Sequence, residues 1–219
     1  LVENNTVYYK GVGIAAAFGG GSTNNVYVGN KLYNGSGIGG MGSFTGCTFN
    51  DNYVSGSASV GADCKLYNNT IDGKVTLRGA NIVASENVIN NAVTISSSNV
   101  TFKNNNVTGT VTVSANGNVI EGNNITSTGN YAVDLGSKTG NNVTDNLLIA
   151  SALKGDAAVS SASETNIVEN NRPVPASLVV VADNITVGET AVINVTVDSD
   201  AEGTVSLIVN GKEYTVEIT

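Results

Sequence analysis

Three stretches of this chain repeat one pattern: residues 66–77 read LYNNTIDGKVTL, residues 84–95 read ASENVINNAVTI, and residues 102–113 read FKNNNVTGTVTV. Each stretch begins 18 residues after the previous one. An apolar residue stands first and sixth, an asparagine stands fourth, and an apolar–polar–apolar triplet closes the stretch. Alternation with a period of two residues is typical of a strand with one buried face. The repeat therefore predicts short strands separated by turns rich in Asn, Gly and Ser.

The pattern continues in both directions along the chain. A coil of about 18 residues cannot bury its own apolar side chains, but stacked coils can, because equivalent residues then lie about 4.8 Å apart. We therefore predict an all-β parallel β-helix. The repeated asparagines should form a structural ladder, because a short amide satisfies backbone groups at a turn. Its predicted members, separated by 17, 18, 18, 18, 23 and 24 residues, are Asn52, Asn69, Asn87, Asn105, Asn123, Asn146 and Asn170.

The handedness of the helix is predicted from the residue two places before the last apolar residue of each coil. A left-handed helix of the hexapeptide type needs a small residue there. This chain has Val75, Val93 and Val111 instead. The longer coils of 23 and 24 residues also suit a right-handed helix better, so we expect the right-handed form.

A second region begins near the only two prolines of the chain, Pro173 and Pro175. Proline stiffens a linker and ends a strand ladder. We expect the β-helix to cover residues 1–172, a linker to cover 173–177, and antiparallel strands to follow in 178–219. Asn210-Gly211 is a strong hairpin signal. About 40 residues amount to the first half of an immunoglobulin-like β-sandwich, which has about 100 residues.

Composition excludes several classes of function. The net charge is −8 and the basic residues are scattered singly. Nucleic acid and anionic membranes are therefore unsuitable partners, because both need clustered Lys and Arg. There is no histidine, so neither a Ser-His-Asp nor a Cys-His constellation can form. We expect no cofactor and no metal site, and we read the chain as an excised piece of a longer protein.

Many β-helix proteins degrade polysaccharides, so acidic clusters need inspection. In the position expected just before the ladder asparagine, only Asp145 and Glu169 could be neighbours. The charged trio Asp72, Lys74 and Arg78 has nothing charged stacked above or below it in the predicted register. Catalysis by such a face needs paired carboxylates. We therefore expect no catalytic residue, with a polysaccharide lyase or hydrolase as the alternative.

Three further sets of residues carry predictions. Cys47 and Cys64 occupy equivalent positions on consecutive coils, which predicts stacked core cysteines, with a disulfide as the alternative. Thr76, Thr94 and Thr112 should form an outward column that reflects strand propensity rather than ice binding. Possible glycosylation sites in Asn-x-Ser/Thr sequons are Asn68, Asn106, Asn124, Asn184 and Asn194.

The coils resemble the right-handed parallel β-helix repeat family. The stretches DNITVGET at 183–190 and INVTV at 193–197 resemble the immunoglobulin-like repeats of large archaeal surface proteins. Together they are similar to adhesin-like proteins of methanogenic archaea. This resemblance implies a non-enzymatic, extracellular, cell-surface adhesin or stalk, whose partner is a glycan or protein of another cell. Lengthened coils at 126–131 and 150–162 are the expected contact loops.

Overall fold

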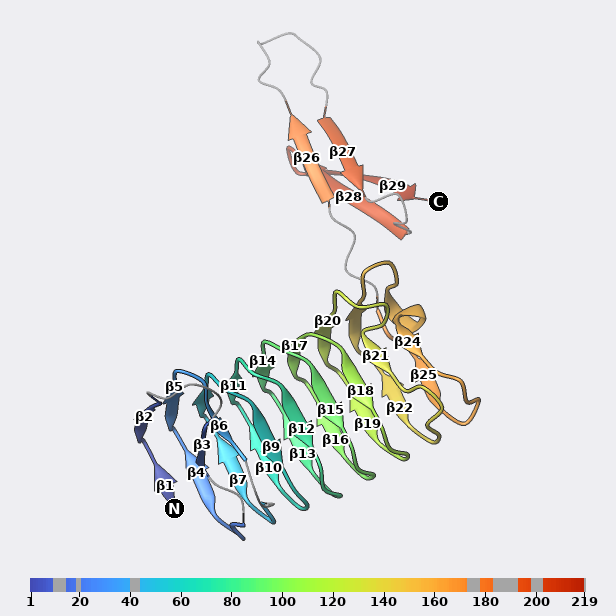
Figure 1. The fold of residues 1–219 in the computed structure, drawn as a ribbon. Coiled ribbons are helices and arrows are strands. Elements are labelled where there is room, and N and C mark those ends of the chain that lie inside the picture. The colour runs from blue at the N-terminus through green and yellow to red at the C-terminus, as the bar shows by residue number, and fades with distance from the viewer. Residues whose placement is uncertain are drawn as a thin grey trace. The chain divides into compact units, whose positions relative to one another are not determined.

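The computed structural model describes residues 1–9, 15–18, 21–39, 44–172, 178–182, 193–197 and 203–218. The chain divides into two compact units, Leu1–Val174 and Pro175–Thr219. The first unit is an all-β parallel β-helix, as predicted, with successive coils stacked side by side (Figure 1). The helical element among the described residues is one short 3-10 turn, η1 (Gly155–Ala158).

Each coil contributes one strand to each of three parallel sheets, here called A, B and C. Sheet A comprises β1 (Val2–Glu3), β4 (Val26–Val28), β7 (Thr48–Asn50), β10 (Lys65–Tyr67), β13 (Val83–Ser85), β16 (Thr101–Lys103), β19 (Val119–Glu121), β22 (Asn142–Thr144) and β25 (Ile167–Glu169). Sheet B comprises β2 (Thr6–Tyr8), β5 (Lys31–Tyr33), β8 (Tyr53–Val54), β11 (Thr70–Ile71), β14 (Val88–Ile89), β17 (Asn106–Thr108), β20 (Asn124–Thr126) and β23 (Leu147–Ile149). Sheet C comprises β3 (Ala15–Phe18), β6 (Ser36–Ile38), β9 (Ala58–Val60), β12 (Val75–Leu77), β15 (Val93–Ile95), β18 (Val111–Val113), β21 (Val133–Asp134) and β24 (Val159–Ser160).

The register places like residues over like residues. In sheet C, Thr76 pairs with Thr94, and Thr94 pairs with Thr112. In sheet A, Leu66 pairs with Ala84 on one side and with Phe49 on the other. The strands are only two to four residues long within the β-helix, so a single coil holds few internal contacts. Stability therefore accrues between coils, as in other repeat proteins.

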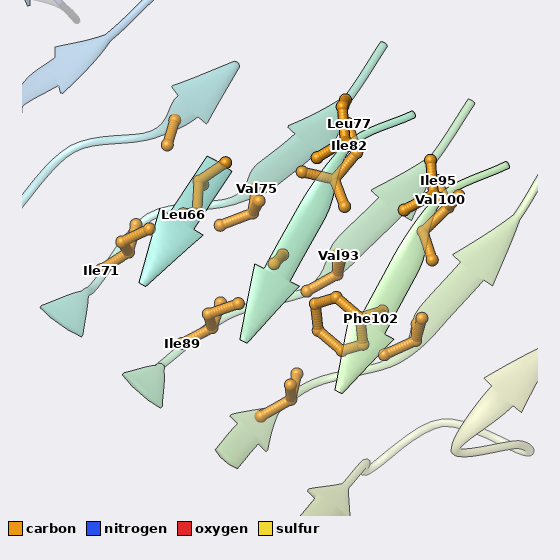
Figure 2. Close-up of a cluster of buried hydrophobic side chains, with 14 of the residues drawn as sticks. Leu66, Ile71, Val75, Leu77, Ile82, Ile89, Val93, Ile95, Val100 and Phe102 are labelled. Atoms are coloured by element: carbon orange, nitrogen blue, oxygen red, sulfur yellow. The ribbon is translucent and has the colours of Figure 1, made fainter. Parts of the chain in front are cut away.

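The core is a continuous column of aliphatic and aromatic side chains inside the stacked coils (Figure 2). A sheet C strand such as β12 buries its first and last residues, whereas the three-residue sheet A strand β16 buries its middle residue, Phe102. Each fully buried Val, Leu, Ile or Phe contributes about 1.5–3 kcal/mol. The alternation seen in the sequence thus corresponds to an inside and an outside of each strand.

The irregular N-terminal region also belongs to the stack. Strands β4 and β5 pair with β7 and β8, so the coil register continues upstream of residue 47. Tyr27 stacks on Phe49 with ring centroids 4.8 Å apart, and both rings pack edge-on against Phe44. These aromatic contacts fill part of the core of the first coils.

The second unit contains two antiparallel strand pairs. β26 (Leu178–Ala182) pairs with β27 (Ile193–Val197), and β28 (Gly203–Val209) pairs with β29 (Lys212–Ile218). Asn210 and Gly211 both have positive φ, 52° and 78°, which is the geometry of a type I′ turn. The predicted hairpin is therefore confirmed. The predicted linker, residues 173–177, lies outside the described residues.

Candidate functional site

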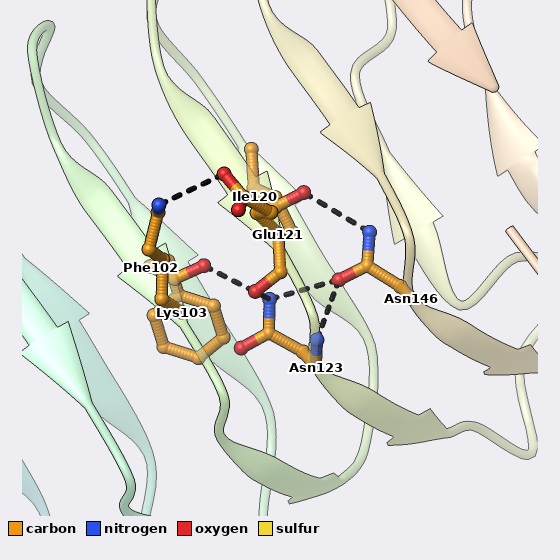
Figure 3. Close-up of polar contacts among 6 residues, drawn as sticks. All are labelled: Phe102, Lys103, Ile120, Glu121, Asn123 and Asn146. Carbon is orange, nitrogen blue, oxygen red and sulfur yellow. Dashed lines mark hydrogen bonds and ion pairs between the residues drawn. The ribbon is translucent and has the colours of Figure 1, made fainter. Parts of the chain in front are cut away.

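The asparagine column is a continuous chain of hydrogen bonds between successive coils. In each step the backbone N–H and the side-chain amide of one asparagine both donate to Oδ1 of the asparagine in the next coil. From Asn105 to Asn123 these distances are 2.9 and 3.0 Å. The Nδ2 of Asn105 also donates to the carbonyl of Ala84 at 3.0 Å. Figure 3 shows the next step, from Asn123 to Asn146, at 2.8 and 2.9 Å.

The structure extends the predicted column and corrects its last member. In order, the column consists of Asn5, Asn30, Asn52, Asn69, Asn87, Asn105, Asn123, Asn146 and Asn171. Asn5 and Asn30 were not predicted, because Asn34 stands at the regular step of 18 residues before Asn52, whereas Asn30 stands 22 residues before it. Asn34, which stands 18 residues before Asn52, lies instead in an exposed turn with φ 60°.

The prediction of Asn170 as a ladder residue is wrong, because the last coil was placed one residue out of register. Asn170 fits the repeat with Ile167 as the apolar residue three places before it, and such a residue should be buried. In the structure Val168 pairs with Val143, and Ile167 is 46% exposed. Two adjacent apolar residues make the inward position ambiguous, and a slip of one residue exchanges the faces of a strand.

The residue before each ladder asparagine adopts the left-handed conformation. Nine successive coils share this feature, with φ between 53° and 67°, at Asn4, Gly29, Asp51, Asn68, Glu86, Asn104, Gly122, Asp145 and Asn170. Only Gly, and to a lesser degree Asn and Asp, enter this region at low cost. The turn between sheets A and B thus explains why Asn, Asp or Gly fills this outer position in eight of these nine coils, Glu86 being the exception. It also means that Glu169 does not stand there beside Asp145.

The two cysteines lie in a second inward column, at the turn that leads into sheet A. Both are fully buried and both thiols are free. Cys47 Sγ contacts the carbonyl of Ser22 at 3.4 Å. Burial raises the pKa of the Cys64 thiol, which keeps it protonated. In later coils the same column holds Asn118, whose backbone N–H and side-chain amide donate to Asn141 Oδ1 at 2.9 and 3.1 Å.

Of the charged trio Asp72, Lys74 and Arg78, Asp72 is the centre of a hydrogen-bond network at the surface. Its carboxylate accepts from the Tyr53 hydroxyl at 2.7 Å and from Asn90 Nδ2 at 2.8 Å. The hydrogen bond to Asp72 raises the pKa of Tyr53. Lys74 and Arg78 are exposed. The arrangement ties three neighbouring coils together at the edge of sheet B.

Polar groups inside the described part of the β-helix are satisfied. Every buried side-chain nitrogen and oxygen among the described residues has a hydrogen-bond partner. In the same residues, no group of three or more His, Cys, Asp or Glu side chains is placed to hold a metal ion. The described chain also contains no helix that has the length and apolar character to span a bilayer.

The outward threonine column continues into other polar residues. Between neighbouring coils, Thr76 pairs with Ser59 and Thr112 pairs with Asp134. Asp134 in turn pairs with Ser160. All of these side chains are partly buried between their neighbours. The column is therefore a single row of mixed hydroxyl and carboxylate groups on sheet C.

The structure distinguishes the predicted sequons. Asn106 and Asn124 are exposed on strands of sheet B, and Asn194 is exposed on β27. Asn68 lies in the left-handed turn and its Nδ2 donates to Asn50 Oδ1 at 3.5 Å. Asn184 lies outside the described residues.

The two lengthened coils meet at one corner, between sheets B and C. Ser151 N–H donates to the carbonyl of Gly129 at 3.1 Å. Within the second loop, Gly155 and Ala158 of η1 are buried. The second loop is therefore anchored at Ala150, Gly155 and Ala158, whereas residues such as Ser151 and Ala157 stay exposed.

The second unit holds an apolar cavity of about 300 Å³. Its lining comes from alternate positions of three strands and consists of Ile193, Val195, Val197, Val205, Leu207, Tyr214 and Val216. Val195, Tyr214 and Val216 remain 36%, 49% and 65% exposed. The two strand pairs thus present apolar residues that they do not bury themselves.

Comparison with known proteins adds no relative. No protein-family model, no curated protein and no solved structure matches the chain. The architecture itself defines the chain as a parallel β-helix repeat protein followed by a smaller antiparallel β unit.

Proposed function

We propose that this chain is a non-enzymatic structural or adhesive protein of the cell surface, in which the β-helix serves as a stiff stalk. The observation that carries the proposal is the asparagine column. Each Asn side chain uses its oxygen as acceptor and its amide as donor within the turn, as at Asn105 and Asn123. The most strongly repeated polar residue therefore serves coil-to-coil cohesion, which is the property a stalk requires.

The proposal includes two finer features of the fold, the handedness of the β-helix and the architecture of the second unit. We infer a right-handed helix from Val75, Val93 and Val111 and from the long coils, and we infer that residues 178–219 begin an immunoglobulin-like sandwich. The apolar residues that line the cavity of the second unit support the latter, because a completed sandwich would bury them. In both features the chain resembles the adhesin-like proteins of methanogenic archaea.

The proposed location is extracellular, and the proposed partner is a glycan or protein on another cell. The net charge of −8 supports a role away from nucleic acid and anionic lipid. The parallel β-helix also occurs among polysaccharide-degrading enzymes, and fold does not determine function. The test must therefore measure binding and catalysis on the same preparation.

The test incubates the full chain with a panel of acidic and neutral polysaccharides and with whole cells. Bound protein is quantified, while new reducing ends and unsaturated products are measured in parallel. The proposal predicts that no degradation product forms. An adhesin should bind saturably to one of the surfaces, whereas a stalk alone should not bind. Heat-unfolded protein is the matched control for non-specific adsorption. Product that accumulates in proportion to folded protein would contradict a non-enzymatic function.

A further inference from the structure

Two sequons lie side by side in sheet B. The first is Asn106-Val107-Thr108 in β17, and the second is Asn124-Ile125-Thr126 in β20. The strands are paired in register, so that Asn106 is opposite Asn124 and Thr108 is opposite Thr126. All four side chains are exposed, whereas the central Val107 and Ile125 are buried. Both asparagines therefore project from the same outer face.

These two asparagines are held in the sheet by their backbone and not by their side chains. Their backbone N–H groups are bonded within the sheet, to Asn87 O and Asn105 O at 2.8 Å. Their side-chain amides have no hydrogen-bond partner among the described residues. Two further Asn-x-Ser/Thr sequences begin at Asn34 and Asn142 and are less accessible, because Asn142 is partly buried and Ser36, the hydroxyl residue after Asn34, is 1% exposed. A substituent on Asn106 or Asn124 would extend into solvent without displacing core atoms.

We propose that this face of sheet B accepts one N-linked glycan, on Asn106 or on Asn124, and that the folded chain does not carry both. The proposal rests on the extracellular function proposed above, because the modification belongs to secreted proteins. In the transfer, Asn Nδ2 bonds to the anomeric carbon of a lipid-diphosphate oligosaccharide. The anomeric C–O bond breaks, the lipid diphosphate leaves with its electron pair, and an amide proton passes to a base of the transferase.

The spacing between neighbouring strands is the reason why the two asparagines should not both carry a glycan. Neighbouring strands of a sheet lie about 4.8 Å apart, and side chains at paired positions stand parallel. A sugar ring with its hydroxyl groups is wider than this spacing, so two glycans rooted at paired asparagines would overlap at their first residues. Transfer precedes folding, because each strand backbone is bonded on both sides in the folded β-helix. Doubly modified chains should therefore fail to fold and should be lost from the secreted monomer.

The experiment secretes the full chain from a host with N-glycosylation and maps site occupancy by mass spectrometry on the folded monomer. Asn106→Gln and Asn124→Gln each leave one site, and Thr108→Val removes the first sequon while retaining its asparagine. We expect each single variant to be modified at its remaining site, and we expect the doubly modified form to be lost from the wild-type monomer.

Two results would overturn the proposal. One is a doubly modified monomer present at the product of the two single-site occupancies. The other is unmodified Asn106 and Asn124 in the wild type and in every variant. Circular dichroism of each variant confirms that the monomer is folded. Site occupancy is independent of the binding assay, so failure here is distinguishable from failure of the proposed surface function.

Discussion

Asn171 ends the asparagine column on a carboxylate. Its backbone N–H and its Nδ2 both donate to Oδ1 of Asp156, at 3.0 and 2.7 Å. Asp156 belongs to η1, within the lengthened coil between β23 and β24, and it takes the position that an asparagine of a further coil would occupy. The loop thus satisfies the last donors of the ladder, in the way that capping units end other repeat proteins.

Asp156→Ala should destabilise the β-helix by about 1–3 kcal/mol, because two donors of Asn171 lose their acceptor. Asp156→Asn keeps an oxygen at the same place, so its cost should stay below about 1 kcal/mol. Urea unfolding of both variants measures the difference. Equal loss in the two would show that the charge of Asp156 matters rather than its acceptor oxygen.

Glu86 is the poorest residue for its left-handed turn, with φ 59°. Asn occupies the same position in the coils on either side, at Asn68 and Asn104. Glu86→Asn should therefore stabilise the chain by about 0.5–1 kcal/mol, since the left-handed conformation costs most residues about 1–2 kcal/mol. Glu86→Gln removes the charge but keeps the penalty, so it should not share the gain. A rise in melting temperature for both variants would assign the effect to charge instead.

The ion pair between Lys103 Nζ and Glu121 Oε2 spans 2.9 Å on the outer face of sheet A (Figure 3). Its side chains are 39% and 40% exposed, so water and salt screen the attraction. Glu121→Gln should cost less than about 1 kcal/mol, and the difference should shrink as salt is raised. A salt-independent loss of several times that size would show that the pair has a larger role than its exposure implies.

A thiol reagent should detect two free thiols, those of Cys47 and Cys64, in denatured protein without reductant. In the folded chain, burial and the raised pKa of Cys64 both disfavour the thiolate that reacts with alkylating agents. Alkylation should therefore be slow until the β-helix unfolds. Because the pKa of Cys64 is higher when folded, its contribution to stability is present at neutral pH and is lost as pH rises through that pKa. Absence of thiols after denaturation would indicate a disulfide.

The β-helix was predictable from sequence because its signal is repeated. Six ladder asparagines, Asn52 to Asn146, were assigned from spacing, and all six lie in the column. Asn5, Asn30 and Asn171 were not assigned, because the N-terminal region is irregular and the pair Ile167-Val168 obscures the register of the last coil. The role of Asp156 had no repeated signal, since a cap occurs once.

The left-handed turn was present in the sequence as a preference for Asn, Asp and Gly just before each ladder residue. We considered that position only for its charge, so we did not predict the left-handed backbone conformation there. The outer faces were less predictable for a physical reason. A solvent-exposed residue such as Asn106 has few constraints from packing, so its type carries little information about its role.

The most direct test of the account compares Asn105→Leu with Asn106→Leu. Asn105 is buried in the column, and its replacement by Leu leaves the backbone N–H of Asn87 without its acceptor. It also removes the side-chain hydrogen bonds to Asn87 Nδ2, to the carbonyl of Ala84 and to Oδ1 of Asn123. Since an unsatisfied buried group costs about 1–3 kcal/mol, Asn105→Leu should lower the free energy of unfolding by about 1–3 kcal/mol. Asn106→Leu, one residue away and exposed, should change it by about 0.5 kcal/mol or less. Equal unfolding free energies for the two variants would contradict the claim that the asparagine column holds the coils together.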